Sequence, residues 1–187
     1  MANKPRILLG PKDLVWSLIP LVLLCLLFAG LAARCSFSPG GPKAGPVPTF
    51  DARNALRADA ATMAFPIRAP KLPAGWKSNS GSHGTAVGAG GGPVTTVGFI
   101  TPGNRYLELA QSSASEEALA KYVDSELVHT AATQVGGHTW EVYSAPTKES
   151  AWVADLGGVR TLIRGAGTEQ EYTALAAGVA EAAPLTK

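Results

Sequence analysis

The sequence contains few of the residues that form disulfides or metal sites. Of its 187 residues, two are cysteine and three are histidine. Cys25 and Cys35 are ten positions apart, about 15 Å along a helix, which is too far for a disulfide. No cysteine follows Cys35, so we expect the rest of the chain to be stable through packing alone.

Histidines and acids are too scattered to indicate a catalytic or metal-binding cluster. His83, His129 and His138 include no pair at i, i+4, and no cysteine or carboxylate cluster accompanies them. A hydrolytic triad can be assembled from distant residues, for example Ser82, His129 and Asp155, but no Gly-x-Ser-x-Gly motif singles one out. We therefore assign no catalytic, cofactor-binding or metal-binding residue and expect no cofactor.

The glycine-rich stretch at residues 78–93, SNSGSHGTAVGAGGGP, lacks the motif of a phosphate-binding loop. Gly88 and Gly90 begin the spacing of a dinucleotide-binding fingerprint, but Pro93 stands where that fingerprint requires glycine. No Lys-Ser or Lys-Thr pair follows, as it would in a P-loop. We expect a flexible surface loop between strands.

Basic residues are not in excess over the larger part of the chain. Residues 36–187 hold 12 Lys or Arg against 13 Asp or Glu. Affinity for nucleic acid requires a basic surface that displaces counterions from the phosphate backbone. This charge balance therefore excludes a nucleic-acid partner.

The longest hydrophobic run lies near the N-terminus. Residues 14–33, LVWSLIPLVLLCLLFAGLAA, contain no charged residue. A helix of this length extends about 30 Å, which matches the hydrocarbon core of a bilayer. We predict a cytoplasmic N-terminus at residues 1–13 and a transmembrane helix at residues 14–34.

The charges that flank this segment predict its orientation. Lys4, Arg6 and Lys12 precede the segment, against Asp13 alone. Short basic flanks stay in the cytoplasm under the positive-inside rule, so everything after residue 34 is expected to be extracytoplasmic. The predicted location is the cell membrane, crossed once.

Two alternatives to a retained membrane helix remain open. A cleaved signal peptide also has a basic start and an apolar core, but that core is usually about 7 to 15 residues long. Gly30-Leu31-Ala32 or Leu31-Ala32-Ala33 would serve as a weak cleavage site. Lipidation at Cys35 requires a small residue directly before the cysteine, and Arg34 stands there.

Beyond the membrane segment the sequence predicts a linker and then one domain. Residues 36–49 contain four prolines and three glycines, so residues 35–49 are expected to form an extended linker. Residues 50–187 follow the order helix, three strands, helix, three strands, helix. Because hairpins connect most of these strands, we predict an α+β domain with an antiparallel sheet and helices packed on one side.

Two short segments predict tight turns between strands. Residues 94–100 and 105–111 have strand composition and flank Thr101-Pro102-Gly103-Asn104, which fits a type II turn with the glycine at positive φ. Leu156-Gly157-Gly158 lies between two further strands and predicts a second hairpin.

Two capping-box spacings predict helix starts. Ser113 and Glu116 form the first, and the apolar spacing behind them indicates a helix that ends near Gly136. Thr168 and Glu171 form the second and begin the last helix.

One strand carries the candidates for partner binding. Arg160, Leu162 and Arg164 alternate with their neighbours along residues 159–164 and therefore share one face of a strand. That face is either a solvated surface or a site for an anionic lipid or acidic partner, with Leu162 as an apolar contact.

The three tryptophans of the domain are interpreted as core residues. Trp76, Trp140 and Trp152 offer rings that stack on sugars or lipid head groups in other proteins. A small domain without disulfides needs large rings in its core, so burial is the expected role.

Short motifs in a fixed order resemble the actinobacterial domain of unknown function 4245 family. The similar stretch covers residues 50–181, and the alanine-rich composition and N-terminal apolar segment resemble that family too. The motifs are Leu72-Pro73-Ala74-Gly75-Trp76, Gly98-Phe99-Ile100-Thr101-Pro102-Gly103, Tyr106-Leu107, Gln111-Ser112, Gly136-Gly137 before Trp140, and Ile163-Arg164-Gly165.

The resemblance implies an actinobacterial envelope protein with one N-terminal anchor and assigns it no activity. The Pro-Ala-Gly-Trp element before an antiparallel sheet also resembles the Mog1/PsbP sandwich, a fold used mostly for binding and assembly. We predict a non-catalytic binding or assembly module with an envelope protein or cell-wall partner. The alternative is an extracytoplasmic hydrolase whose site is assembled from scattered residues.

Overall fold

The computed structural model describes residues 11–32 and 50–186, and within the first of these segments it describes the side chains of residues 12 and 15–28. The chain divides into two compact units, Met1–Pro46 and Val47–Lys187. The linker predicted at residues 35–49 lies outside the described residues.

The first unit contains helix α1, Pro11–Ala32, which includes Pro20. It begins three residues before the predicted segment of residues 14–34. Its described large apolar side chains are all exposed, Trp16 by 74% and Leu26 by 63%. Within the residues that the structure describes, no helix is both long enough and apolar enough to cross a membrane.

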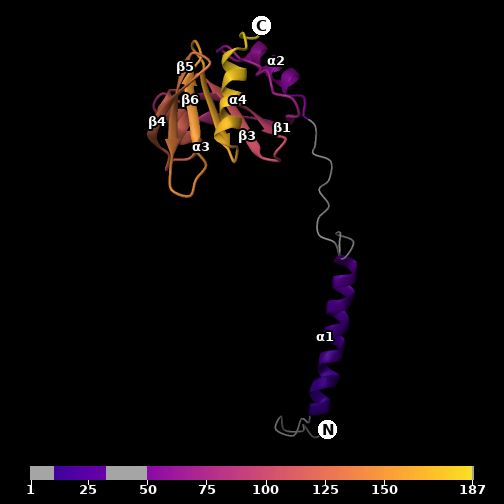
Figure 1. The fold of residues 1–187 in the computed structure, drawn as a ribbon. Helices are drawn as coiled ribbons and strands as arrows, with labels where there is room; N and C mark the ends of the chain where they lie inside the picture. Colours follow the sequence, from indigo (N-terminus) through magenta and orange to yellow (C-terminus); the bar gives the residue numbers. More distant parts are fainter. Residues whose placement is uncertain (1–10, 33–49, 187) are drawn as a thin grey trace. The chain divides into compact units, whose positions relative to one another are not determined.

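The second unit is an antiparallel sheet with helices, which confirms the predicted α+β class (Figure 1). Its seven strands lie in the order β1-β2-β3-β7-β6-β5-β4. The strands are β1 (Lys77–Ala86), β2 (Gly92–Ile100), β3 (Tyr106–Ser112), β4 (Val128–Val135), β5 (His138–Ser144), β6 (Ala151–Asp155) and β7 (Arg160–Gly165), and the helices are α2 (Ala52–Thr62), α3 (Glu116–Val123) and α4 (Glu169–Ala180).

Two antiparallel meanders build this sheet. Strands β1 to β3 form the first and β4 to β7 form the second, and the two join where β3 pairs with β7. A helix follows each meander, α3 after the first and α4 after the second. The first and fourth strands of the chain consequently lie at opposite edges of the sheet.

The prediction that the helices pack on one side of the sheet is wrong. Helices α2 and α4 share one hydrophobic core, which includes Leu56, Leu175 and the rings of Phe99 and Trp140. Helix α3 belongs to a second core on the other face, around Leu119 and the inward side chains of β6 and β7. Each β-strand presents alternate residues to the two faces, so both faces had apolar side chains to cover.

The predicted helix up to Gly136 is also wrong in length. Helix α3 ends at Val123, because the backbone of the next residue, Asp124, is extended. Strand β4 follows from Val128. The helix starts at Glu116, and its N-cap is Ser115, whose side chain accepts a hydrogen bond from the Ala118 N–H. The predicted capping residue, Ser113, lies before this cap.

Two loop predictions need correction, whereas the hairpins themselves are confirmed. The positive φ of the turn between β2 and β3 is at Asn104 (57°) instead of Gly103, so this connection is not the predicted type II turn. Most of the glycine-rich stretch at residues 78–93 belongs to strands β1 and β2. Gly157 and Gly158 both have positive φ in the confirmed turn between β6 and β7.

The last helix begins as predicted. The Thr168 side chain accepts a hydrogen bond from the Glu171 N–H, and the Glu171 carboxylate accepts one from the Thr168 N–H. The hydrogen bond from Thr101 and the backbone N–H of Thr168 hold the pKa of Glu171 below its usual value. These reciprocal bonds satisfy backbone donors that a helix N-terminus leaves free.

Candidate functional site

The predicted partner-binding face of β7 is covered in its centre. Leu162 is fully buried under α3, so the expectation of an outward leucine is wrong. Arg160 pairs with Asp155, and Arg164 donates to Glu108 at 2.9 Å. The structure therefore separates the two arginines by a buried residue and gives each a carboxylate partner.

The charges at the two ends of β7 are stabilised by their neighbours. The Gly158 N–H holds the pKa of Asp155 below its usual value, against the effect of burial, and Arg160 acts in the same direction. Burial is the largest single influence on the pKa of Arg164 and tends to lower it, but the hydrogen bond to Glu108 and the negative charge of Glu108 together with smaller nearby contributions raise the pKa overall. Asp155 and Arg164 are therefore each stabilised in the charged form by an oppositely charged residue of the same sheet.

The candidate hydrolytic triad is not assembled. Ser82 lies on β1 and His129 on β4, the two edge strands of the sheet. Six strand spacings separate these edges, roughly 29 Å along the sheet. Proton transfer needs the nucleophile and its base within hydrogen-bond reach, so these residues cannot act together.

The histidines make separate pairs in place of a cluster. His83 lies 2.7 Å from the buried carboxylate of Asp59, which also accepts a 2.5 Å hydrogen bond from the Thr95 hydroxyl. His129 lies 2.6 Å from Glu141 on the neighbouring strand. Among the residues that the structure describes, no group of three or more His, Cys, Asp or Glu is placed to hold a metal ion.

The tryptophan prediction is confirmed for two of the three rings. Trp140 is fully buried and donates from Nε1 to the carbonyl of Val135 at 3.3 Å. Trp152 is also buried, 5.2 Å from the ring of Tyr172. Trp76 is only partly buried and packs against the edge of the same core.

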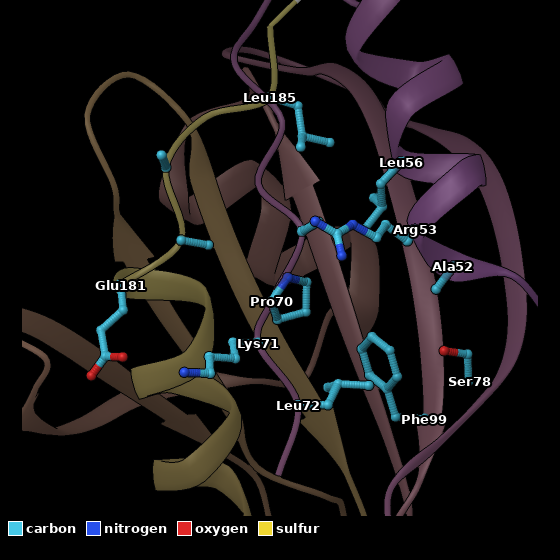
Figure 2. A pocket seen from close by; sticks show the side chains of 13 residues that line it. Ala52, Arg53, Leu56, Pro70, Lys71, Leu72, Ser78, Phe99, Glu181 and Leu185 are labelled. Atoms are coloured by element: carbon cyan, nitrogen blue, oxygen red, sulfur yellow. The ribbon is translucent and has the colours of Figure 1, made fainter. Parts of the chain in front are cut away.

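A cleft of about 720 Å³ lies beside α2, and we call it the α2 cleft (Figure 2). Helix α2 forms one wall, residues 69–72 and 181–185 form the other, and Phe99 and Ser78 come from the sheet. Volumes of this size are typical of small-molecule sites. The cleft thus brings together five separate segments of the sequence.

Residues 65–72, which we call the strap, hold one wall of the cleft in place. The Gln111 side chain, fully buried on β3, accepts from the Arg68 N–H at 2.8 Å and donates to the Arg68 carbonyl at 2.9 Å. The Leu185 N–H donates to the carbonyl of Ile67 at 2.8 Å. The strap is therefore fixed to the sheet below it and to the C-terminal segment beside it.

Arg68 also ties the strap to the end of α4. Its guanidinium donates to the carbonyls of Ala180, Ala182 and Leu156. The strap further approaches α4 at Gly178, where a Cβ would lie 2.4 Å from the carbonyl oxygen of Lys71. Only glycine permits this approach, so the wall of the cleft depends on that position.

The lining of the α2 cleft is mainly apolar, with a few polar groups. Nine of its thirteen lining residues are Ala, Leu, Pro or Phe, and four are polar or charged. Figure 2 shows Leu72 against Phe99 at the base and Arg53 reaching across from α2 toward Pro70. The four polar lining residues are Arg53, Lys71, Ser78 and Glu181.

A second hollow, of about 660 Å³, offers less to a ligand. It lies between β4, β5 and the start of α4, and Glu149 and Glu169 line it. The rings of Trp152 and Tyr172 line it too, but they are 7% and 4% exposed and already pack in the core. The α2 cleft is therefore the stronger candidate site.

The sequence did not point to the α2 cleft. No motif in the sequence marks Arg53 as a binding residue, and Leu72 is singled out only as part of a family motif. No spacing in the chain relates residues 52–56 to residues 181–185, because their contact depends on the strap between them. The predicted face of β7 shares no residue with the cleft.

The fold and the cleft define an α+β domain with a mainly apolar binding site beside its first helix. The chain matches the model of a family described as a protein of unknown function (DUF4245) over residues 6–179, and it belongs to that family. No curated protein and no solved structure matches the chain.

Proposed function

We propose that this chain is a membrane-anchored protein of the cell envelope whose second unit binds a ligand in the α2 cleft without catalysing a reaction. The observation that carries the proposal is the cleft itself, a site of about 720 Å³ with an apolar lining and few charges. The predicted actinobacterial origin and the likeness to the Mog1/PsbP sandwich stay predictions.

The composition and exposure of α1 support membrane anchoring. The uncharged run of residues 14–33 extends past the side chains that the structure describes at both ends. The described apolar side chains of α1 are exposed around the helix, and a helix that is apolar on all sides needs an apolar environment. The basic residues before the run support an extracytoplasmic second unit.

A reporter fusion tests this topology. A reporter that is active only outside the cytoplasm, fused after residue 45, is expected to give activity in the membrane fraction. Activity of only a cytoplasmic reporter at the same position would contradict the orientation. Reporter activity recovered in the medium would instead support cleavage after the apolar run.

The cleft is suited to ligand binding because its walls are held in place before a ligand arrives. Gln111 and Arg68 fix the strap through hydrogen bonds to backbone groups, and α2 is fixed by the contacts of Asp59 with Thr95 and His83. A site whose walls are already ordered loses little conformational entropy on binding.

Filling the cleft is expected to remove its ligand. Ala183 lines the cleft and is exposed, so Ala183→Trp places a ring in the cavity without disturbing the core. Small molecules extracted from the purified full chain and identified by mass spectrometry should include a compound that falls by about tenfold in this variant.

The matched control for this experiment is Ala61→Trp. Ala61 is an exposed residue of α2 that does not line the cleft. This variant should retain the compound, and both variants should keep the wild-type melting temperature. Equal amounts of the same compounds in wild type and Ala183→Trp would show that the α2 cleft is not the binding site.

A further inference from the structure

We propose that the ligand of the α2 cleft is an anionic amphiphile, with a negatively charged head group at Arg53 and an apolar chain along the base of the cleft. This inference rests on the proposed binding function and names the chemical class of the ligand. The apolar contacts, the charge of Arg53 and the position of the other charged groups each support it.

The base of the cleft provides apolar contact for a chain. Leu56 and Phe99 are almost fully buried and form the inner surface, where they belong to the main core of the domain. Leu72 and Leu185 are partly buried and pack against that core from the opposite wall. A ligand chain lying between these side chains would remove apolar surface from water on both sides.

Arg53 provides a cation that has no side-chain partner among the residues that the structure describes. Among the described residues, Arg53 alone of the arginines makes no hydrogen bond or ion pair with its side chain. Figure 2 shows its side chain extending over the cleft toward Pro70. A guanidinium offers several N–H donors in one plane, which suits a carboxylate or phosphate group.

The other two charged lining groups do not neutralise Arg53. Figure 2 shows Lys71 pointing away from Arg53, toward the side of the cleft where Glu181 lies. These two opposite charges are on the α4 side, so together they add no net charge to the site. The region around Arg53 therefore favours a negative group over a neutral or positive one.

Photo-cross-linking of the full chain tests the ligand class. The protein is placed in nanodiscs of phosphatidylcholine, and a sixteen-carbon carboxylate with a diazirine in its chain is added. The labelled peptides are then identified by mass spectrometry. We expect label on peptides that contain residues 69–72 or 181–185, at about ten times the level given by the matching neutral alcohol.

A charge reversal in α2 provides the matched pair of variants. Arg53→Glu should lower labelling by the carboxylate at least about tenfold, because it places a like charge at the head group. Arg57→Glu makes the same change one helical turn away, at a residue that does not line the cleft, and should label as the wild type does. Equal labelling of the two variants would contradict the role of Arg53.

Competition experiments distinguish the sources of the negative group. Excess hexadecanoate should remove the label if the natural ligand carries a carboxylate, and nanodiscs containing phosphatidylglycerol should remove it if the ligand is a membrane phospholipid. Either result supports the amphiphile, whereas competition by inorganic phosphate alone would overturn it. Equal labelling by acid and alcohol would overturn the ligand class and leave the binding site standing, and absence of label from the cleft with both probes would overturn both proposals.

Discussion

Replacing Trp140 by alanine is expected to lower the free energy of unfolding by about 3 to 5 kcal/mol. The ring is fully buried, is among the largest side chains of the core, and contacts the face of the sheet that α2 and α4 cover. The substitution removes this apolar surface and leaves a cavity between the sheet and the helices. It also removes the hydrogen bond that the Val135 carbonyl accepts from the indole N–H.

Urea denaturation followed by circular dichroism measures this loss, and Trp76→Ala serves as the control. Trp76 is partly exposed at the edge of the same core, so its removal creates no enclosed cavity and should cost clearly less. Both variants lose one tryptophan, and therefore a general effect of losing an indole would appear in both. Equal unfolding midpoints for Trp140→Ala and wild type would show that the ring does not support the core.

The features that the sequence predicted well are those that depend on neighbouring residues. The Thr168–Glu171 box forms because both partners lie in one turn of helix, and the hairpin at Gly157-Gly158 forms because two adjacent glycines adopt positive φ. In the same way, strand composition located β2 and β3. These arrangements need no information about the rest of the fold.

The end of α3 shows where prediction from local sequence pattern fails, because the pattern does not locate the last residue of the helix. Leu119, Val123 and Leu127 have helical spacing, and all three contact the second core, but Leu127 reaches it from beyond the end of the helix. Helical spacing therefore continued in the sequence past the point where the helix stops. The uncharged segment that follows pairs with β5 as the edge strand of the sheet.

The β7 face shows a second kind of failure. Alternation correctly placed Arg160, Leu162 and Arg164 on one side of the strand, but it contains no information about what covers that side. Helix α3 packs there and buries Leu162, while the arginines at either end remain accessible enough to meet carboxylates. Which face a helix covers depends on contacts between segments that are distant in the chain.

The α2 cleft depends on such distant contacts throughout. Arg53 lies on α2, the apolar base of the cleft combines the sheet with the strap, and the far wall includes the segment after α4. The hydrogen bonds of Gln111 join two of these parts, because they fix the strap to the sheet. The buried Gln111 side chain is therefore expected to support both the stability of the domain and the shape of its proposed binding site.

Replacing Gln111 by leucine is expected to lower the free energy of unfolding by about 2 to 6 kcal/mol, although leucine is similar in size and apolar. The amide accepts from the Arg68 N–H and donates to the Arg68 carbonyl, and leucine can do neither. Both backbone groups would then lack partners in a site without free access to water, at about 1 to 3 kcal/mol for each group. Because the strap carries one wall of the cleft, this variant should also lose the bound compound.

The neighbouring Thr161 provides a control of opposite sign. It pairs with Gln111 across β3 and β7 and is equally buried, but its hydroxyl has no hydrogen-bond partner among the described residues. Thr161→Val replaces that unsatisfied hydroxyl by a methyl group of the same shape, so stability should be unchanged or higher by up to about 1 kcal/mol. Urea denaturation of the two variants, with hydrogen exchange at the Arg68 amide, separates a lost hydrogen bond from a general disturbance of the core. If Gln111→Leu unfolds at the wild-type midpoint with the Arg68 amide still protected, the strap is held by other contacts and Gln111 does not organise the cleft.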